Sequence, residues 1–467
     1  MNDYVIINPL DNVGVLLKEH DEIPVGHKIA LKDIKSGDAV IKYGTIIGRA
    51  TKNIKKGEWV HSHNLKSHLD ENISFSYNYN CPQFVKKHAN FRGFLREDGR
   101  VGIRNDIYII PTVGCVNSIC KELEQKSQSF VSGTIDSILA LPHQFGCSQL
   151  GEDAENIKML LCNIAMNPNA SFVIFVGLGC ENNSLKNIKQ YLDSKGRKNV
   201  FYFNCQDVQD EISFGLDLIK KCAEKAAKLE RKEASFDKLV IGLKCGGSDA
   251  FSGITANPLI GKMTDKVVSY GGSAILTEVP EMFGAEHFLM NRCASKEVYE
   301  KLAFIVDRFK KFYTDNNFPV YENPSPGNKD GGITTLEEKS CGCITKAGTV
   351  PIVDVLEYGE NIKTIGLNIL DGPGNDLIAS TALAAAGCQI ILFSTGRGTP
   401  LSTFVPTLKI GTNKQLSGFK NNWIDFDAST LDEDKLFGLL VETINGEYKT
   451  KSEVFKEIAF YKKGVTL

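Results

Sequence analysis

Gly242-Leu-Lys-Cys-Gly-Gly-Ser-Asp-Ala-Phe-Ser-Gly-Ile-Thr-Ala-Asn-Pro-Leu-Ile-Gly261 joins a predicted strand, residues 238–241, to a predicted helix, residues 257–270. Asn257 is the expected helix cap, and Pro258 falls in the first turn. A glycine-rich turn between a strand and a helix places free backbone N–H groups at the carboxyl edge of a sheet, where α/β proteins bind ligands. For an isolated segment, a tight turn whose polar groups only satisfy the backbone is the alternative.

The same alternation of strand, glycine turn and helix recurs from residue 91 onward. Predicted strands cover 106–113, 135–141, 171–176, 200–203, 238–241, 274–277, 364–370 and 389–393. Predicted helices cover 117–127, 153–166, 184–194, 207–233, 257–270, 296–315 and 376–386. This order predicts mainly parallel sheets with helices on both faces. Because the pattern restarts near Leu239, we expect two α/β domains, 91–235 and 236–467, the second with a long loop at 316–346.

The first 70 residues differ from the rest. Short β-rich runs at 5–7, 12–17, 39–41, 45–50 and 59–63 alternate with glycine-bearing turns, which predicts a small all-β module over 1–70. Residues 71–90 have little apolar periodicity and are predicted to be a linker.

Composition excludes several classes of protein. The 467 residues are 42% hydrophobic and 24% charged with a net charge of −2, so neither a nucleic-acid nor a membrane partner is expected. The first residues do not have the character of a signal peptide, and the thirteen cysteines therefore suggest reduced thiols in a cytoplasmic protein.

Cysteine stands beside glycine after one predicted strand after another, and again in the late loop. The residues are Cys115, Cys147, Cys180, Cys245 and Cys343. A thiol at a helix N-terminus has a lowered pKa, which suits metal ligation or reactivity. The alternative is a set of helix-capping turns with incidental thiols.

Two histidines form a second candidate metal site. His61 and His63 are two residues apart, so in a strand both would point to one face, and His27 in a glycine turn would add a third nitrogen. Exposed or carboxylate-bonded histidines are the alternative.

No phosphate-binding, dinucleotide-binding or Gly-x-Ser-x-Gly fingerprint is present. The predicted strand ends instead carry acid and base groups, namely His143, Glu181, Lys244, Asp249, Glu278, Glu281 and His287. Arg397, in a glycine loop after a strand, would clamp a carboxylate, unless it forms a structural salt bridge.

Several motifs resemble the altronate/galactarate dehydratase family over nearly the whole chain. They are Val25-Gly-His-Lys-Ile-Ala30, Trp59-Val-His-Ser-His-Asn64, residues 91–105, Gly177-Leu-Gly-Cys-Glu181, Lys244-Cys-Gly-Gly-Ser-Asp249, Thr277-Glu-Val-Pro-Glu281, Gly284-Ala-Glu-His287 and Thr395-Gly-Arg-Gly-Thr-Pro400. The resemblance implies an N-terminal SAF (β-clip) module followed by two doubly wound, mainly parallel α/β domains.

The resemblance also implies an activity, the β-elimination of water from a sugar acid to give a 2-keto-3-deoxy acid. Altronate is the expected substrate, with galactarate or a related acid as further possibilities, and we expect a cytoplasmic homodimer. Lys244 or His143 is expected to act as base or acid, while Asp249 and Glu278 position hydroxyls or metal. The remaining predicted substrate-binding residues are Ser248, Asn257, Arg397 and Thr399.

Family members are activated by ferrous iron or manganese, which leaves two metal hypotheses. One is a mononuclear Fe²⁺ or Mn²⁺ held by His27, His61 and His63. The other is an iron–sulfur cluster drawn from Cys115, Cys147, Cys180, Cys245 and Cys343. The alternative functions are a sulfo-lyase acting on a sulfolactate-type substrate and a non-catalytic sugar-acid-binding protein.

Overall fold

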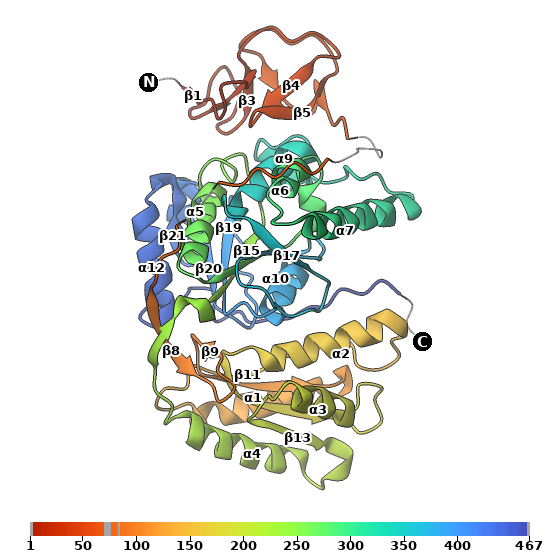
Figure 1. Ribbon diagram of the computed structural model, residues 1–467, viewed down its shortest axis with the longest axis vertical. Coiled ribbons are helices and arrows are strands. Elements are labelled where there is room, and N and C mark those ends of the chain that lie inside the picture. The colour runs from red at the N-terminus through yellow and green to blue at the C-terminus, as the bar shows by residue number, and fades with distance from the viewer. Residues whose placement is uncertain (1–2, 70–75, 83–84, 465–467) are drawn as a thin grey trace.

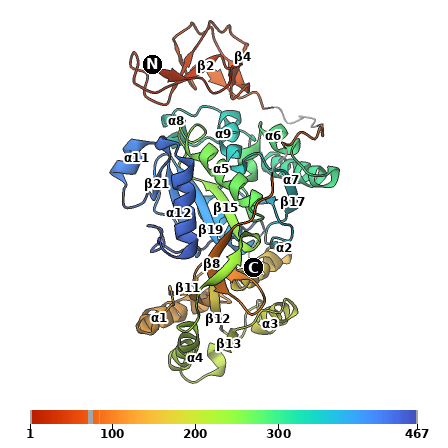
Figure 2. The same ribbon diagram turned by 60° about the vertical axis from the view of Figure 1, so that its left-hand side comes forward.

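A computed structural model describes residues 3–69, 76–82 and 85–464 and shows three parts arranged along its longest axis (Figure 1). An N-terminal β module lies at one end, a domain with a seven-stranded sheet lies in the middle, and a domain with a four-stranded sheet lies at the other end. Figure 2 shows the same order after a turn about that axis. The predicted fold class is therefore confirmed. No helix in the described ranges is long and apolar enough to cross a membrane.

The N-terminal module consists of two small antiparallel sheets, with strand orders β1-β2-β3-β6 and β4-β5-β7. The strands are β1 (Tyr4–Val5), β2 (Val13–Leu16), β3 (Lys28–Ala30), β4 (Ala39–Lys42), β5 (Thr45–Ala50), β6 (Trp59–Val60) and β7 (Leu65–Lys66). Their inward side chains, among them Val13, Val40, Ile47 and Val60, form a separate small core.

The predicted strand over 59–63 is wrong in its second half. β6 ends at Val60, and the following residues form a turn in which the Asn64 side chain accepts a hydrogen bond from His61 N at 2.8 Å. His61 and His63 therefore do not share one face of a strand.

Part of the predicted linker, residues 71–75 and 83–84, lies outside the described residues. The described residues between 76 and 89 form no helix or strand, and they run along the seven-stranded domain. Tyr77 donates its hydroxyl to Cys293 O at 2.8 Å, and Lys87 N donates to Ser269 O at 2.7 Å.

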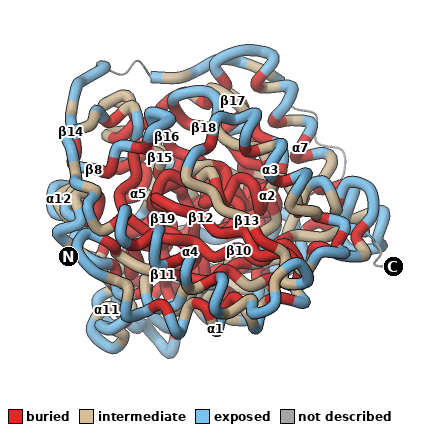
Figure 3. Tube along the Cα trace, turned by 90° about the horizontal axis from the view of Figure 1, so that it is seen from below, coloured by how far each residue is buried: buried red, intermediate tan, exposed pale blue. Residues whose placement is uncertain are grey.

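The four-stranded sheet is parallel, with the order β11-β10-β12-β13. Its elements are β10 (Asp106–Pro111), α1 (Asn117–Ser127), β11 (Ile138–Ala140), α2 (Gly151–Met166), β12 (Ala170–Gly177), α3 (Leu185–Ser194), β13 (Val200–Asn204) and α4 (Glu211–Ala226), with short 3₁₀ helices η1 (Gly114–Val116), η2 (Gln128–Phe130) and η3 (Cys205–Asp207). Figure 3 shows its strands as the buried centre of this end of the molecule.

The predicted helix over 207–233 is too long. α4 ends at Ala226, and β14 (Lys232–Ser235) follows instead. β14 pairs with β8 (Asn90–Leu95), which pairs with β9 (Val101–Gly102) in a small antiparallel sheet. Phe91 of β8 is buried in the core of the seven-stranded domain, so this sheet ties the two α/β domains together.

The seven-stranded sheet is parallel, with the order β17-β18-β16-β15-β19-β20-β21. Its elements are η4 (Phe236–Lys238), β15 (Val240–Cys245), α5 (Ala256–Ser269), β16 (Ser273–Leu276), η5 (Val279–Met282), α6 (Glu286–Met290), α7 (Lys296–Asp315), α8 (Pro326–Asp330), α9 (Leu336–Cys343), η6 (Ile344–Ala347), β17 (Ile352–Leu356), β18 (Leu367–Leu370), α10 (Asp376–Ala385), β19 (Ile390–Thr395), β20 (Thr407–Gly411), α11 (Lys414–Phe419), β21 (Phe426–Asp427), η7 (Ala428–Thr430) and α12 (Glu433–Asn445). Strands β16, β17 and β18 lie on one side of β15, and the later strands β19, β20 and β21 lie on its other side. Ligands bind at such a switch point, beyond the carboxyl ends of the strands.

The predicted long loop at 316–346 contains two helices, α8 and α9. All eight residues of α9 are buried although its sequence, Leu-Glu-Glu-Lys-Ser-Cys-Gly-Cys, has no amphipathic period. Thr335 caps the helix by accepting a hydrogen bond from Glu338 N. Tertiary burial on several sides, which local sequence does not encode, therefore stabilises this helix.

The two α/β domains pack through α2 and α10, which lie side by side. The residue after α2, Asn167, donates to Ala384 O near the end of α10, at 2.9 Å, so the two helices meet near their carboxyl ends. Each helix runs opposite to the parallel strands that it covers.

Candidate active site

Lys244 and Cys245 are the last two residues of β15, at the switch point of the seven-stranded sheet. Successive strand residues point to opposite faces, so the two side chains diverge. Both are buried. The sequence places them at the sheet edge because Gly246 and Gly247 end the strand, and a Cβ at Gly246 would lie 2.4 Å from an Asp376 oxygen.

Lys244 is held by two carboxylates. Its ammonium group donates to Glu278 Oε1 and, at 2.8 Å, to Asp376 Oδ1. Burial opposes the charge on Lys244, but the two carboxylates outweigh it and raise the pKa of Lys244 well above its ordinary value. Burial and the nearby Cys245 sulfur raise the pKa of Glu278. Glu278 adopts φ +70°, a left-handed conformation that is strained for a glutamate and recurs at functional sites.

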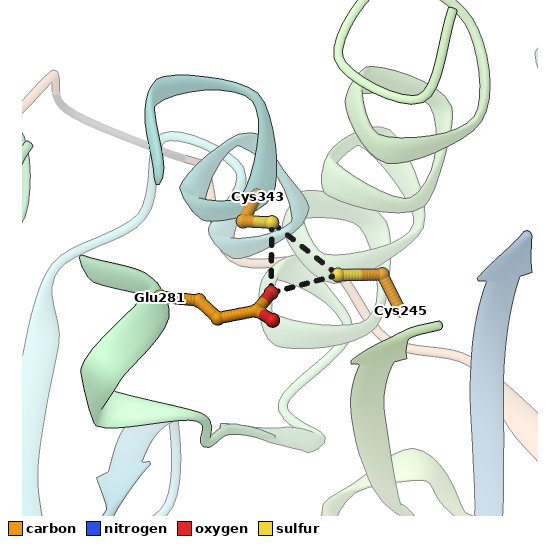
Figure 4. A group of neighbouring side chains, drawn as sticks. All are labelled: Cys245, Glu281 and Cys343. Atoms are coloured by element: carbon orange, nitrogen blue, oxygen red, sulfur yellow. Dashed lines mark hydrogen bonds between the residues drawn. The ribbon is translucent and has the colours of Figure 1, made fainter. Parts of the chain in front are cut away.

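On the other side of the strand, Cys245, Glu281 and Cys343 point toward one another from β15, η5 and α9 (Figure 4). The two sulfurs are 3.4 Å apart, and Glu281 Oε2 lies 3.6 Å from Cys245 Sγ and 3.1 Å from Cys343 Sγ. All three residues are buried.

Lysines surround this group. Lys346 Nζ donates to Cys245 Sγ at 2.7 Å, and Lys339 Nζ donates to Glu281 Oε1 at 2.7 Å. The hydrogen bond from Cys343, with help from Lys346 and against burial, lowers the pKa of Cys245 to about 6. Burial opposes ionisation of Glu281, yet Lys339 and the neighbouring lysines lower its pKa to about 2. The group therefore carries a thiolate and a carboxylate near neutral pH.

The chemistry of these donors fits a divalent metal ion. In tetrahedral sites with metal–sulfur bonds of about 2.3 Å, two sulfurs lie roughly 3.8 Å apart, close to the separation of Cys245 and Cys343. Thiolates select softer ions, so Fe²⁺ suits this donor set better than Mn²⁺. Among the described residues this is the one group of three or more ligand residues whose donor atoms lie within 4.8 Å of one another.

Helix α9 connects this group to the N-terminal module. Its Glu338 carboxylate binds Lys28 Nζ and Lys42 Nζ, both at 2.8 Å, and all three side chains are buried. Its Glu337 binds Ser67 Oγ at 3.0 Å. The next residues of the same helix include Lys339 and Cys343, so the module and the buried thiols are held by one short element.

The predicted histidine site has a different geometry. His27 Nε2 lies 3.2 Å from Asp330 O, and His61 Nε2 lies 2.9 Å from Lys329 O, so both rings face the end of α8. Burial lowers the pKa of His61 to about 4. His63 is exposed and packs edge-on against Trp59. These three histidines do not form a group of ligands as close as Cys245, Glu281 and Cys343.

Several other predicted residues organise the loop after β15. Asp249 accepts hydrogen bonds from Ser252 N at 2.9 Å and Thr412 Oγ1 at 2.9 Å, and burial raises its pKa. Asn257 donates to Gly342 O at 3.0 Å and accepts from Ser394. A small cavity of about 10 Å³, room for one water, lies beside Asp249 and Asn257. Its lining also includes Ser248, Lys42, Tyr43, Lys339 and Cys343.

Arg397 and Thr399 lie in the loop after β19. Arg397 is exposed, its backbone N–H donates to Gly247 O at 3.0 Å, and its guanidinium reaches Gly327 O at 3.4 Å. Among the described residues its side chain has no carboxylate partner, so the salt-bridge alternative is not supported. Thr399 caps a turn by accepting from Leu401 N at 3.2 Å.

The structure places the other predicted residues at the carboxyl edge of the four-stranded sheet. His143 is buried there, where its Nε2 lies 2.8 Å from Pro111 O and its Nδ1 accepts from Phe145 N at 3.2 Å. Burial lowers the pKa of His143 to about 4. Cys115, Cys147 and Cys180 lie at the same edge. Predicted residues are thus divided between two sheet edges, and His143 does not meet Lys244.

Sequence reasoning missed four charged residues of the site. Lys339 and Lys346 lie in the segment interpreted as a loop, and Asp376 is the first residue of α10. Lys409 is buried on β20 with its ammonium 3.6 Å from the Phe393 ring centre, and burial lowers its pKa to about 7. A lysine inside an otherwise apolar strand, as in Leu408-Lys-Ile410, was the available indication.

Three domain families match consecutive parts of the chain. They are the altronate/galactarate dehydratase SAF domain at residues 2–68, the D-galactarate dehydratase/altronate hydrolase second domain at 93–227, and the D-galactarate/altronate dehydratase C-terminal domain at 236–466.

Full-length relatives match as well. The chain is 48% identical to the altronate dehydratase of Bacillus subtilis, over 97% of this chain and 94% of the relative. It is 42% identical to the altronate dehydratase of Escherichia coli, over 99% of this chain and 100% of the relative. A third relative, the (2R)-sulfolactate sulfo-lyase subunit beta of Chromohalobacter salexigens, is 29% identical over 78% of this chain and 94% of its own length.

Proposed function

The chain belongs to the altronate/galactarate dehydratase family, and from that membership we propose that it is a hydro-lyase that removes water from a sugar acid, altronate first among them. The observation that carries the substrate is the end-to-end identity with two altronate dehydratases, 48% and 42%. The identity to the galactarate dehydratase of Escherichia coli is 28%, so galactarate comes second.

The reaction needs a base for the proton next to the carboxylate and an acid for the leaving 3-hydroxyl. Glu278 fits the first role because burial and the nearby Cys245 sulfur raise its pKa, which makes its carboxylate a stronger base than an exposed glutamate. Lys244 fits the role of the acid, because two carboxylates keep its ammonium group protonated. It does not fit the role of the base, since a lysine must be neutral to accept a proton. His143 fits neither, because both ring nitrogens bind backbone groups at the other sheet edge.

Removing the α-proton places a second negative charge on the substrate carboxylate. Lys244, Lys339 and Lys346 would donate hydrogen bonds to this anion in a region shielded from water, where charge-assisted hydrogen bonds are strongest. Asp376 has 35% of its side chain exposed, so the substrate would approach along the α10 N-terminus. Arg397, exposed beside Gly247, would bind the far end of an extended acid.

Cys245, Glu281 and Cys343 would hold Fe²⁺, which when bound would act as a Lewis acid toward the substrate oxygens. The alternative ligands His27, His61 and His63 stay a prediction. The cytoplasmic location and the homodimer also stay predictions. Light scattering of the purified chain would test the homodimer.

A substrate panel tests the proposed function. The purified chain with added Fe²⁺ or Mn²⁺ should convert altronate to a 2-keto-3-deoxy acid faster than any other aldonate or aldarate. Absence of a keto product from every sugar acid would refute the proposal.

A C–S lyase reaction on a sulfolactate-type substrate is the second candidate, favoured by the match to the sulfo-lyase subunit beta. It shares the α-deprotonation step and differs in the group that leaves. Release of sulfite from sulfolactate, without keto product from altronate, would select it.

A further inference from the structure

The thirteen cysteines are distributed unevenly. Free cysteine is among the most often buried residue types, and most cysteines of this chain are buried or half-buried. Three are exposed, namely Cys115, Cys147 and Cys180. They follow β10, β11 and β12, which are neighbours in the four-stranded sheet. All the exposed thiols of the chain therefore lie at one sheet edge.

Hydrogen bonds tie the three cysteine-bearing loops together. Gly114 N, next to Cys115, donates to Phe145 O at 2.9 Å in the loop of Cys147. Asn183 N, close to Cys180, donates to Gly146 O at 3.2 Å. The loop of Cys147 thus contacts both of the others within three residues of each thiol. Because neighbouring strands are about 4.8 Å apart, loops joined in this way present their side chains over a small area.

Each exposed cysteine follows a glycine that the backbone requires. Gly146 has φ +109°, and a Cβ there would lie 2.0 Å from Thr112 O. Gly179 has φ +128°, and a Cβ there would lie 2.7 Å from the Gln206 side chain. At Gly114 the distance to His143 O would be 3.1 Å. The glycines let the loops approach closely and leave each following thiol at the surface.

From this arrangement we propose that Cys115, Cys147 and Cys180 hold an iron–sulfur cluster. The three thiols lose their protons to solvent on binding, and each thiolate binds iron. The sulfurs of ligands to a single ion lie roughly 3.8 Å apart. These three cysteines form no such close group, whereas cluster ligands bind different irons and lie farther apart.

The edge offers three exposed thiols rather than four. Cys205 follows β13, the fourth strand of the same sheet, but is half-buried against the domain core, and burial raises its pKa to about 11. A cluster with three protein ligands keeps one iron open to a small molecule. A cavity of about 290 Å³ adjoins the loops, lined by Asn117, Pro142, His143, Gln144, Phe145, Ile458, Ala459 and Phe460.

This site is separate from the Cys245 group and does not depend on the proposed reaction. The full chain purified without oxygen should be brown and contain acid-labile sulfide, with at least as much iron as sulfide because the Cys245 group would hold one further iron ion. Cys115→Ser, Cys147→Ser and Cys180→Ser should each reduce the sulfide content about tenfold or more. The matched control Cys205→Ser, at the same edge, should retain it, and so should Cys343→Ser at the other edge.

Circular dichroism of each variant separates loss of the cluster from loss of the fold, and Cys→Ala at the same positions repeats the test. Three results would overturn the proposal: wild-type protein without sulfide, folded Cys115, Cys147 and Cys180 variants that keep their sulfide, or loss of sulfide on Cys343→Ser alone. Wild-type protein that binds iron but contains no sulfide would also overturn the proposal.

Discussion

Replacing Glu338 with glutamine would test how the N-terminal module is joined to the site. The Glu338 carboxylate lies between two buried ammonium groups, those of Lys28 and Lys42, each 2.8 Å away. It also accepts hydrogen bonds from Thr334 N at 2.9 Å and from its hydroxyl at 2.7 Å. Removing one partner of a buried ion pair costs about 3–5 kcal/mol, because the remaining charge is left without compensation. Glu338→Gln leaves two such charges, so we expect a loss in that range.

Urea denaturation followed by fluorescence measures the loss, since guanidinium salts would screen the charges. The chain has two tryptophans, and in a Trp423→Phe background the signal comes from Trp59, which lies in the module. Asp434→Asn is the control. That carboxylate is almost fully exposed in its contact with Lys266, so its removal should cost less than about 1 kcal/mol.

The pH dependence has a definite sign. The two lysines hold the pKa of Glu338 below its ordinary value of 4.5 despite burial, so its contribution is present above that pH and is lost as the pH falls. The difference between wild type and Glu338→Gln should therefore shrink below about pH 4.5. A difference of less than about 1 kcal/mol at pH 7, or one that grows in acid, would refute the ion-pair reasoning.

Three further changes test the site. Lys244→Met should lower kcat for keto-acid formation by about 100-fold or more while circular dichroism is unchanged, and near-wild-type turnover would exclude Lys244 as the acid. Arg397→Lys should raise KM for altronate about tenfold with little change in kcat, because lysine lacks the bidentate fork of arginine. Steady-state kinetics that show a lower kcat with an unchanged KM would mean that Arg397 acts in the chemical step instead. Burial lowers the pKa of Lys409 to about 7. The folded chain therefore binds fewer protons than the unfolded chain between about pH 7 and 10. The free energy of unfolding should rise with pH in that range, by at most about 1.4 kcal/mol per pH unit. Lys409→Met should lose that rise in urea titrations and be more stable at pH 7, and an unchanged slope would contradict the assignment.

The sequence predicted the sheet edge of the site well because strands and glycine turns are encoded locally. The buried run before Lys244 and the glycines after Cys245 were sufficient to place both residues at the carboxyl edge of a strand. Glu278 was found by the same reasoning, as the second residue after β16.

The structural surroundings that sequence reasoning did not predict depend mostly on long-range packing. Cys343 was expected in a loop, but α9 forms because its whole surface is covered by the module, η5 and η6. The predicted strand through His61 and His63 was wrong for a local reason, since the Asn64 side chain closes a turn directly after β6. Which of the five glycine-flanked thiols belong together depends on domain packing, which local sequence patterns do not encode.

The most direct test is to locate the metal and the substrate in crystals of the full chain grown with Mn²⁺ and altronate. Diffraction data collected at the manganese absorption edge would distinguish an added ion from cluster iron. We predict an anomalous peak between Cys245, Glu281 and Cys343, with the altronate carboxylate beside Lys244. A manganese peak at His27 and His61, with altronate bound away from β15, would contradict the account.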